Sequence, residues 1–262
     1  MDLQLHDRVA VVTGASKGIG LAVARTLREE GARVVTASRT RPEDLDAVHV
    51  SVDLTDPGAP AEVIARAVEE FGRLDILVNN AGGPPPGDRL PHGGFLERTD
   101  AHWQAMFEFN LFSAVRASRA ALPIFLEAGE GVIVNVSSGT GRQPQAFNVD
   151  YSGAKAAMMN LTKALSEEFG PRGVRVNGVA PGPTLTPWWT DEGGAGDRIA
   201  AMTGSDRESV LTTVAAELMQ LTTGRLVEAQ EIADAVAFLA SPRSASTTGT
   251  ELAVDSGLIK AL

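Results

Sequence analysis

The sequence predicts an α/β protein in which a doubly wound parallel sheet of about seven strands carries helices on both faces. Two observations support this prediction: short aliphatic runs alternate with longer segments of helical periodicity, and glycine-rich turns follow several runs. Repeated strand–helix alternation builds βαβ units, whose right-handed crossovers place helices on both faces of the sheet. Because no linker or repeat divides the chain, we expect residues 1–262 to form one domain.

The first half of the chain supplies four of the predicted strands. Residues 9–12 (Val-Ala-Val-Val) form a continuous apolar run, which is typical of a strand buried on both faces. Residues 19–30 have apolar positions at helical spacing, and Gly31 ends this helix. The same patterns predict valine-rich or isoleucine-containing strands at 33–37, 48–52 and 75–78, and a helix at 61–71.

The second half of the chain continues the alternation. It is predicted to contain helices at 99–126, 151–169 and 228–240 and strands at 132–136, 174–179 and 251–254. Pro123 should bend the first of these helices, and Gly170-Pro171 should end the second. Residues 83–98 and 187–224 have no regular pattern, and loops of this length in a compact domain usually have a function.

The composition excludes several kinds of site. The chain has no cysteine, which rules out disulfides, thiol nucleophiles, iron–sulfur clusters and thiolate metal sites. Its formal net charge of −10 argues against a nucleic-acid partner, because neutralising phosphates needs clustered lysine and arginine. The histidines at 6, 49, 92 and 102 lack ligand spacing, so we expect no metal. No targeting segment or apolar membrane span is visible, and we expect a cytoplasmic protein with no membrane partner.

A glycine-rich loop connects the first predicted strand to the first predicted helix, and it reads Thr13-Gly14-Ala15-Ser16-Lys17-Gly18-Ile19-Gly20. Glycines let a backbone approach a pyrophosphate closely, and a helix N-terminus supplies free N–H groups and a positive dipole end. The alternative is a plain glycine-rich turn, but strand, turn and helix follow one another as a dinucleotide site requires. We therefore predict a Rossmann-type cofactor site with Gly14, Ser16, Lys17, Gly18, Ile19 and Gly20 as binding residues.

The residues after the second predicted strand favour NADP over NAD as the cofactor. An NAD site usually has a carboxylate about 20 residues after the glycines, where it bonds the ribose 2′-hydroxyl. This chain has Ser38 and Arg39 in that region instead. Arg39 could bind a 2′-phosphate through two hydrogen bonds, and Lys17 could add a second positive charge. The alternative is that both cations are ordinary surface residues.

Further ordered motifs follow the glycine loop. They are Asn79-Asn80-Ala81-Gly82 after the fourth predicted strand, Ser138 with Tyr151-Ser152-Gly153-Ala154-Lys155, Pro181-Gly182, and Val254-Asp255. With these motifs the sequence resembles the short-chain dehydrogenase/reductase family over nearly the whole chain. Several motifs in one order are highly specific, whereas any one of them alone would be weak.

The resemblance implies roles that local patterns alone do not assign. It places Asn110 with Ser138, Tyr151 and Lys155 in the family's catalytic set; the alternative for Asn110 is a polar residue bonded to backbone. It also implies that Lys155 reaches the nicotinamide ribose and that Thr186 contacts the nicotinamide amide. The remaining residues assigned to the cofactor are Asp53 and Leu54 beside the adenine, Asn80, Ala81 and Gly82 along the adenosine, and Tyr151, Pro181, Gly182 and Thr184.

The spacing of Tyr151 and Lys155 independently predicts acid–base chemistry. Residues four apart share a helix face, and a nearby ammonium lowers the pKa of a phenol from its reference near 10. Bringing that pKa to roughly 7 takes about 4 kcal/mol, which we ascribe to Lys155 and a cationic nicotinamide together. Tyr151 would then exchange a proton with a carbonyl substrate whose oxygen Ser138 holds. Strand alternation points Ser137 the other way, and the alternative for Tyr151 is a packed core residue.

Residues 187–224 should cover the nicotinamide end of the site. Their apolar side chains suggest a helical lid over a bulky hydrophobic substrate. The same residues could equally contact another subunit, and the resemblance implies a homotetramer, with a homodimer as the alternative.

The predicted function is the NADPH-dependent reduction of a hydrophobic ketone, a small-molecule carbonyl compound, to a secondary alcohol. Three alternatives stay open: a 3-oxoacyl thioester reductase of fatty-acid type, an NAD-linked alcohol dehydrogenase, and an NADP-sensing protein without turnover. The acidic net charge weighs against the first alternative, because an acyl carrier protein is itself acidic. The presence of Ser138, Tyr151 and Lys155 weighs against the third.

Overall fold

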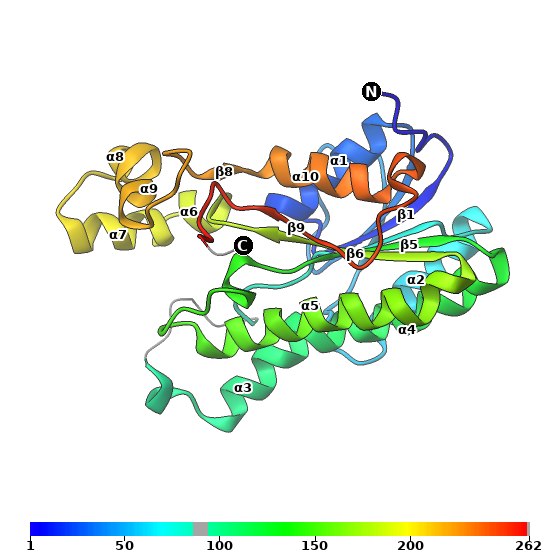
Figure 1. Ribbon diagram of the computed structural model, residues 1–262, viewed down its shortest axis with the longest axis horizontal. Helices are drawn as coiled ribbons and strands as arrows, with labels where there is room; N and C mark the ends of the chain where they lie inside the picture. The colour runs from blue at the N-terminus through cyan, green and yellow to red at the C-terminus, as the bar shows by residue number, and fades with distance from the viewer. Residues whose placement is uncertain (86–93, 261–262) are drawn as a thin grey trace.

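A seven-stranded parallel sheet forms the centre of the computed structural model, which describes residues 1–85 and 94–260 (Figure 1). The strands follow in the order β3 (Val48–Ser51), β2 (Arg33–Ser38), β1 (Val9–Thr13), β4 (Ile76–Asn79), β5 (Gly131–Val136), β6 (Val174–Pro181) and β9 (Glu251–Val254). All neighbouring pairs are parallel, and the order reverses direction between β1 and β4. The predicted fold class is confirmed.

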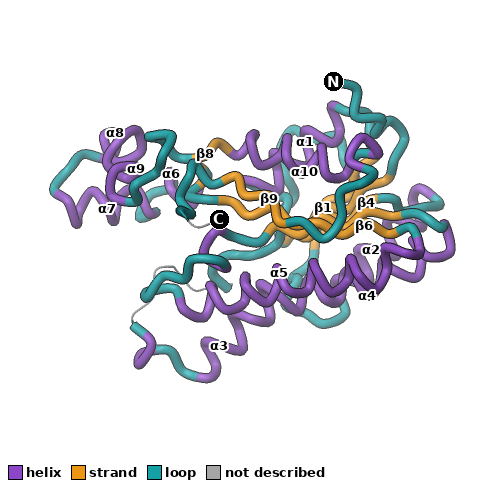
Figure 2. The backbone as a smooth tube through the Cα atoms, in the orientation of Figure 1, coloured by secondary structure: helices purple, strands orange, loops and turns teal. Residues whose placement is uncertain are grey.

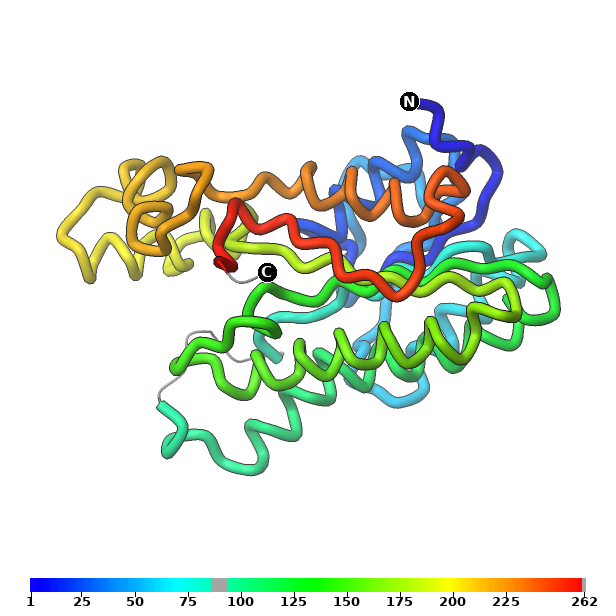
Figure 3. The backbone as a smooth tube through the Cα atoms, in the orientation of Figure 1, coloured from blue at the N-terminus to red at the C-terminus, as the bar shows by residue number. Residues whose placement is uncertain are grey.

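Helices cover both faces of this sheet (Figure 2). On one face lie α1 (Gly18–Glu29) and α10 (Ala229–Ala240), which are far apart in sequence but packed together (Figure 3). On the other lie α2 (Ala59–Phe71), α4 (Ser113–Ala128) and α5 (Val149–Phe169). The run at residues 9–12 is wholly apolar because β1 is buried on both faces. Ala10 and Val12 face the first helix layer, and Val9 and Val11 face the second.

The long helical stretch predicted over 99–126 is present, but a π turn interrupts its α-helical hydrogen bonding. It consists of α3 (Asp100–Phe107), a π-helical turn η2 (Glu108–Phe112) and α4, and Pro123 lies inside α4. The π turn contains Asn110, whose side chain donates to the Met106 carbonyl at 3.1 Å and so competes for a backbone acceptor. Periodicity does not reveal such a turn, because the apolar pattern continues through it.

Residues 187–224, which we call the lobe, contain several short helices, as the suggested helical lid would require, although the sequence showed no regular pattern there. The lobe contains α6 (Pro187–Thr190), α7 (Ala195–Thr203), α8 (Arg207–Ser209), a π turn η5 (Val210–Val214) and α9 (Ala215–Leu218). It projects from one end of the molecule in Figure 1, between β7 (Thr184–Leu185) and β8 (Val227–Glu228), which pair as a second, two-stranded parallel sheet. Trp189, Val210 and Leu221 belong to a separate small core, so most of the apolar residues in the lobe pack against one another.

The shorter elements are 3₁₀ turns, which are η1 (Phe95–Glu97), η3 (Gly139–Gly141), η4 (Gly170–Arg172) and η6 (Pro242–Ser244). Within the second long stretch predicted to be irregular, 83–98, residues 86–93 lie outside the described residues. In the described part of the chain, no helix is both long enough and apolar enough to cross a bilayer.

Candidate active site

The predicted site residues gather where the parallel strands end. Loops that leave the carboxyl ends of parallel strands meet at one edge of the sheet, where ligands bind in this class of fold. Gly14 follows β1, Arg39 follows β2, Asn80 follows β4 and Ser138 follows β5. Pro181 is the last residue of β6. The structure therefore brings together groups that are more than 160 residues apart in sequence.

The glycine loop lies directly against the turn that follows β4. Gly14 has a positive φ of +67°, and its amide donates to the Ala37 carbonyl at 2.7 Å. A Cβ atom at Gly14 would lie 2.8 Å from the Ala81 Cα, and one at Gly20 would overlap both the Gly14 carbonyl and the Asn80 side chain. Only glycine fits these two positions, because neighbouring backbone fills the space of a side chain.

Asn80 holds this loop in place. Its side-chain amide donates to the carbonyls of Thr13 and Gly14 at 2.9 and 3.1 Å. The Thr13 hydroxyl oxygen in turn accepts from the amides of Asn80 and Ala81, at 3.0 and 3.1 Å. Thr13 was not among the predicted site residues, and a buried hydroxyl at the end of an apolar strand is the signal that could have found it.

The start of α1 has the features of an anion site. The helix begins at Gly18, and the Lys17 side chain at its N-cap makes no capping bond. The first backbone N–H groups of a helix have no intrahelical acceptor, so they can bind a phosphate. Gly14 and Gly20 let the loop fold closely against Asn80 and Ala81, while Ser16, Gly18 and Ile19 are partly buried at the start of the helix. These residues fit the pyrophosphate of a dinucleotide.

The groups expected near the adenosine differ in how freely they can bind a ligand. Arg39 is exposed, whereas the Ser38 hydroxyl donates to the Thr40 carbonyl at 2.9 Å. The Lys17 ammonium lies 3.5 Å from the Asp191 carboxylate of the lobe, so the second expected cation pairs within the chain.

Asp53 and Leu54, expected beside the adenine, form a turn after β3. The Asp53 carboxylate accepts from the Thr55 amide and hydroxyl, at 2.9 and 2.7 Å, and these bonds lower its pKa. Leu54 is buried. The Asp53 carbonyl also accepts from the Asp56 amide at 3.0 Å, so the polar atoms of this turn are largely engaged within the turn.

Ser138, Tyr151 and Lys155 form one cluster. Tyr151 and Lys155 lie one turn apart on α5, and the Lys155 Nζ is 5.7 Å from the centre of the Tyr151 ring. The Lys155 Nζ donates to the Val136 carbonyl at 3.0 Å. The Ser138 side chain lies near enough to the Tyr151 phenol to lower its pKa, and it accepts from the Thr140 amide and hydroxyl at 3.3 and 3.0 Å.

Asn110 and Gly82 complete this cluster. A Cβ atom at Gly82 would lie 2.8 Å from both the Asn110 Oδ1 and the Lys155 Nζ, so only a glycine lets these groups approach. The Asn110 Oδ1 accepts from the Gly83 amide at 2.7 Å, and its Nδ2 donates to the Gly83 carbonyl at 2.9 Å. Together with the bond to Met106, these contacts direct the buried Asn110 amide at backbone.

Burial changes the pKa of two groups in this cluster. It raises the pKa of the Tyr151 phenol above its ordinary value, although the hydrogen bond with Ser138 opposes the rise. It lowers the pKa of Lys155 to about 8, and the charge of Glu251 opposes that fall. The lowering of the Tyr151 pKa was expected from Lys155 and a cationic nicotinamide together; in the chain by itself this pKa is raised, because the buried phenol loses its hydration.

Ser137 points away from this cluster, as strand alternation predicts. Its hydroxyl contacts the Val179 carbonyl at 3.2 Å and the Glu251 carboxylate. Glu251 reaches across β6 over Gly178, where a side chain would collide with the carboxylate. Burial raises the pKa of Glu251. Sequence reasoning missed this residue, and the signal for it is one carboxylate in an otherwise apolar strand.

The segment after β6 faces the glycine loop. The Gly182 amide donates to the Val254 carbonyl at 3.0 Å, and the Thr184 hydroxyl donates to the Gly182 carbonyl at 2.9 Å. Thr186 lies beside the loop, since a Cβ atom at Gly18 would be 3.4 Å from the Thr186 Cβ. Thr186 thus lies against the glycine loop, while the Thr184 hydroxyl supports the turn.

Within residues 1–85 and 94–260, no three or more histidine or acidic side chains gather as a metal site would require. His92 lies outside the described residues.

Comparison with known proteins relates this geometry to a family. The family model described as short chain dehydrogenase matches residues 8–194. The chain is 40% identical over 262 residues to cis-4-hydroxycyclohexanecarboxylate dehydrogenase of Sinomonas cyclohexanicum, with 96% of each chain covered. It is 36% identical over 265 residues to the 3-oxoacyl-acyl-carrier-protein reductase FabG of Vibrio cholerae, with 98% of this chain and 99% of the relative covered.

A solved structure is similar over the whole length. L-Sorbose reductase from Gluconobacter frateurii, complexed with NADPH and L-sorbose, is 32% identical, covers 100% of both chains and has a TM-score of 0.89. The names of these relatives cite a cyclic hydroxy acid, an acyl thioester and a sugar. The fold is therefore shared more closely than the compound that is bound.

Proposed function

The chain belongs to the short chain dehydrogenase family, whose members are oxidoreductases, and from this premise we propose an NADP-dependent enzyme that reduces a ketone to a secondary alcohol. One observation carries the proposal. The Tyr151 phenol is buried near Ser138, whose side chain lowers its pKa, and the Lys155 ammonium lies 5.7 Å from the centre of its ring. In the proposed reaction these three residues act as the proton donor, the donor for the substrate oxygen and the nearby cation.

The loops at the strand ends would hold the cofactor. Gly14, Gly18 and Gly20 would admit the pyrophosphate, Arg39 would meet the 2′-phosphate, and Thr186 would lie near the nicotinamide. NADPH, when bound, supplies the hydride. The L-sorbose reductase bound to NADPH supports this choice of cofactor.

The remaining chemistry belongs to side chains of this protein. Tyr151 gives its phenolic proton to the carbonyl oxygen of the substrate as that oxygen gains negative charge. Ser138 donates a hydrogen bond to the same oxygen. Lys155, which is charged below its pKa of about 8, favours the phenolate that Tyr151 leaves behind. Asn110 fixes the backbone of Gly83 beside this cluster.

We propose a bulky hydrophobic ketone as the substrate. Phe147, in the loop before α5, and Trp188, in the lobe, are 47% and 38% exposed, and both lie close in sequence to site residues. Similarity to the dehydrogenase from Sinomonas leaves an NAD-linked alcohol dehydrogenase open as an alternative function. Similarity to FabG leaves a 3-oxoacyl thioester reductase open. The lobe would act as the lid, and an NADP-sensing protein without turnover stays the last alternative.

The outer face of α4 and α5 supports a homotetramer, or a homodimer, of this chain. The two helices lie side by side in Figure 1, and a groove of about 500 Å³ runs between them. Its apolar lining includes Leu122, Leu126, Leu161 and Leu165. Light scattering after gel filtration would give the mass directly, and a monomer at micromolar concentration would contradict this proposal.

A consumption assay tests the reaction. The purified chain is mixed with NADPH or NADH and with 4-oxocyclohexanecarboxylate, decalone, a quinone, L-sorbose or acetoacetyl-N-acetylcysteamine. We expect NADPH to be consumed fastest with the apolar bicyclic ketone. Binding of NADPH without turnover of any compound would favour the sensing protein, and preference for the thioester would favour the fatty-acid type.

A further inference from the structure

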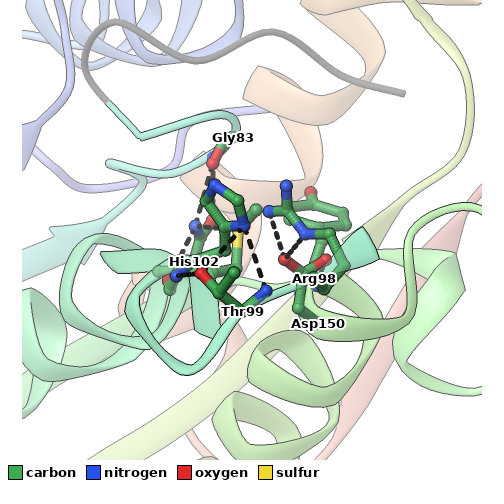
Figure 4. Close-up of polar contacts among 8 residues, drawn as sticks. Gly83, Arg98, Thr99, His102 and Asp150 are labelled. Atoms are coloured by element: carbon green, nitrogen blue, oxygen red, sulfur yellow. Dashed lines mark hydrogen bonds and ion pairs between the residues drawn. The ribbon is translucent and has the colours of Figure 1, made fainter. Parts of the chain in front are cut away.

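A buried ion pair lies at the N-terminal end of α5, one residue before Tyr151. The side chains of Arg98 and Asp150 are only 5% and 1% exposed. The Arg98 Nε and Nη2 both donate to the Asp150 Oδ2, at 2.8 and 2.5 Å (Figure 4). Removing one partner of such a pair leaves a buried charge without compensation, so the two side chains hold each other in place.

The second oxygen of Asp150 contacts the backbone of Tyr151 itself. The Asp150 Oδ1 accepts from the Tyr151 amide at 2.9 Å. Amides in the first turn of a helix have no intrahelical acceptor, and a negative charge there is favoured by the helix dipole. Asp150 therefore joins Arg98 to the backbone of the proposed proton donor.

Arg98 is itself anchored by the start of α3. It directly precedes Thr99, whose side chain accepts from the His102 amide at 3.4 Å, while the Thr99 amide donates to the His102 Nδ1 at 3.2 Å. Figure 4 shows this capping pair beside the Arg98–Asp150 pair. Arg98 and Asp150 are 52 residues apart in sequence, and their ion pair joins the start of α3 to the start of α5.

The next turn of α5 is held by the same helix. A Cβ atom at Gly153 would lie 3.6 Å from the Trp103 ring and 3.7 Å from the Phe107 ring, so α3 packs closely on α5 at this glycine. Tyr151 lies between this contact and the ion pair along the chain, and it packs against the small apolar cluster of Met106 from α3 and Ala154 from α5. The first turns of α5 are therefore fixed against α3 on both sides of Tyr151.

We propose that Arg98 and Asp150 are positioning residues that set where the Tyr151 phenol meets Ser138. This inference rests on the proposed function, because it gives Tyr151 the role of proton donor. Neither side chain needs to touch substrate or cofactor. A displacement of about 1 Å at a reacting group can cost roughly 100-fold in rate. Greater mobility of the first turn of α5, which carries Tyr151, should therefore slow the chemical step.

The test is the double variant Arg98→Met/Asp150→Asn. It removes both charges of this pair at once, and the asparagine oxygen can still accept from the Tyr151 amide. We expect kcat, for the panel ketone that the wild type reduces fastest, to fall about 10- to 100-fold, with the dissociation constant of NADPH within about twofold of wild type. Arg98→Lys keeps the positive charge, so its kcat should fall less than that of the double variant.

The matched control is Arg225→Met/Glu231→Gln. This pair also joins an arginine to the first turn of a helix, since Arg225 donates to Glu231 at 2.7 and 2.8 Å and Glu231 accepts from the Glu228 amide. It lies at the start of α10, on the opposite face of the sheet from α5, and is exposed. We expect no change in kcat. An equal loss of kcat in both double variants would overturn the proposal.

A spectroscopic readout separates this proposal from the proposed function. Tyr151 is the only tyrosine, so tyrosine labelled with ¹³C at the ring carbon that bears the hydroxyl gives one NMR resonance per folded chain. In the wild type, burial raises the pKa of this phenol. In the Arg98/Asp150 double variant we expect the pKa to fall toward the ordinary value near 10, as water reaches the ring.

Each outcome of this titration decides the proposal. If the resonance and its titration match the wild type in a folded double variant, the proposal is overturned, whether or not any ketone is reduced. If the double variant does not fold, the Arg98→Lys variant carries the same titration. A shifted titration with no turnover by the wild type would support the positioning role and contradict the proposed reaction.

Discussion

The strand-end loops and the lobe are built in different ways. The loops are tied to the sheet by backbone contacts, such as the Gly14 amide to the Ala37 carbonyl and the Asn80 side chain to Thr13. The lobe packs around its own small core and joins the sheet region through the β7–β8 pair and the exposed Lys17–Asp191 ion pair. The family match ends at residue 194, inside the lobe. We infer that the sheet positions the chemistry, whereas the lobe is free to vary with the substrate.

Tyr151→Phe is the strongest test of the inference that the sheet positions the chemistry. It removes only the phenolic oxygen, so we expect reduction to fall about 10²- to 10⁴-fold while NADPH binding stays within about twofold. Steady-state kinetics and fluorescence titration of NADPH measure the two quantities. Turnover that survives the change would mean that another group donates the proton.

Arg39→Asp tests whether the loop after β2 selects the cofactor. Loss of a charge-assisted contact to a 2′-phosphate, with a new repulsion, should shift the NADPH-to-NADH ratio of kcat/KM about 10- to 100-fold toward NADH. Arg243→Asp, an exposed arginine near the opposite end of the strands, is the charge-matched control. An unchanged ratio in the Arg39 variant would remove the basis for the 2′-phosphate site.

Glu251→Gln tests the electrostatics beneath the catalytic cluster. Lys155 loses its proton above its pKa of about 8, so activity that needs the ammonium should fall as pH rises through that value. The charge of Glu251 raises this pKa, and its removal should therefore move the alkaline limb of the kcat profile to lower pH. We expect activity at pH 8 to be about two- to fivefold lower.

The control for this profile is Glu167→Gln. Glu167 pairs with Lys163 on the exposed side of the same helix, α5. Its variant should leave the alkaline limb unchanged. A limb that stays in place in the Glu251 variant, or moves to higher pH, would show that Glu251 does not act on Lys155.

Asp191→Asn probes the contact between the lobe and the glycine loop, and we expect the smallest effect there. An exposed ion pair contributes at most about 1 kcal/mol, so the melting temperature should hardly move. The freed Lys17 should bind NADPH about two- to threefold more tightly, as measured by fluorescence titration. The neighbouring Glu192→Gln is the control, and a large loss of stability would show that the lobe depends on this contact.

Local patterns were sufficient for much of the fold and of the site. The wholly apolar run at 9–12 predicted a central strand, and alternation predicted that Ser137 and Ser138 point to opposite faces. The π turn at Asn110 was not predictable, because it depends on a side chain that competes for the Met106 carbonyl and bonds Gly83. The short helices of the lobe were not resolved from the sequence, because their apolar residues serve a separate small core.

The sequence by itself determined the order of strands and helices, the glycine loop, and which side chains could carry acid–base chemistry. Each of these depends on residues that are near one another in the chain, where periodicity and spacing act. Only the tertiary structure decided that burial raises the pKa of Tyr151, that Glu251 crosses Gly178 toward Ser137, and that Arg98 meets Asp150. Desolvation and ion pairing depend on which distant segments exclude water together, and that is set by packing.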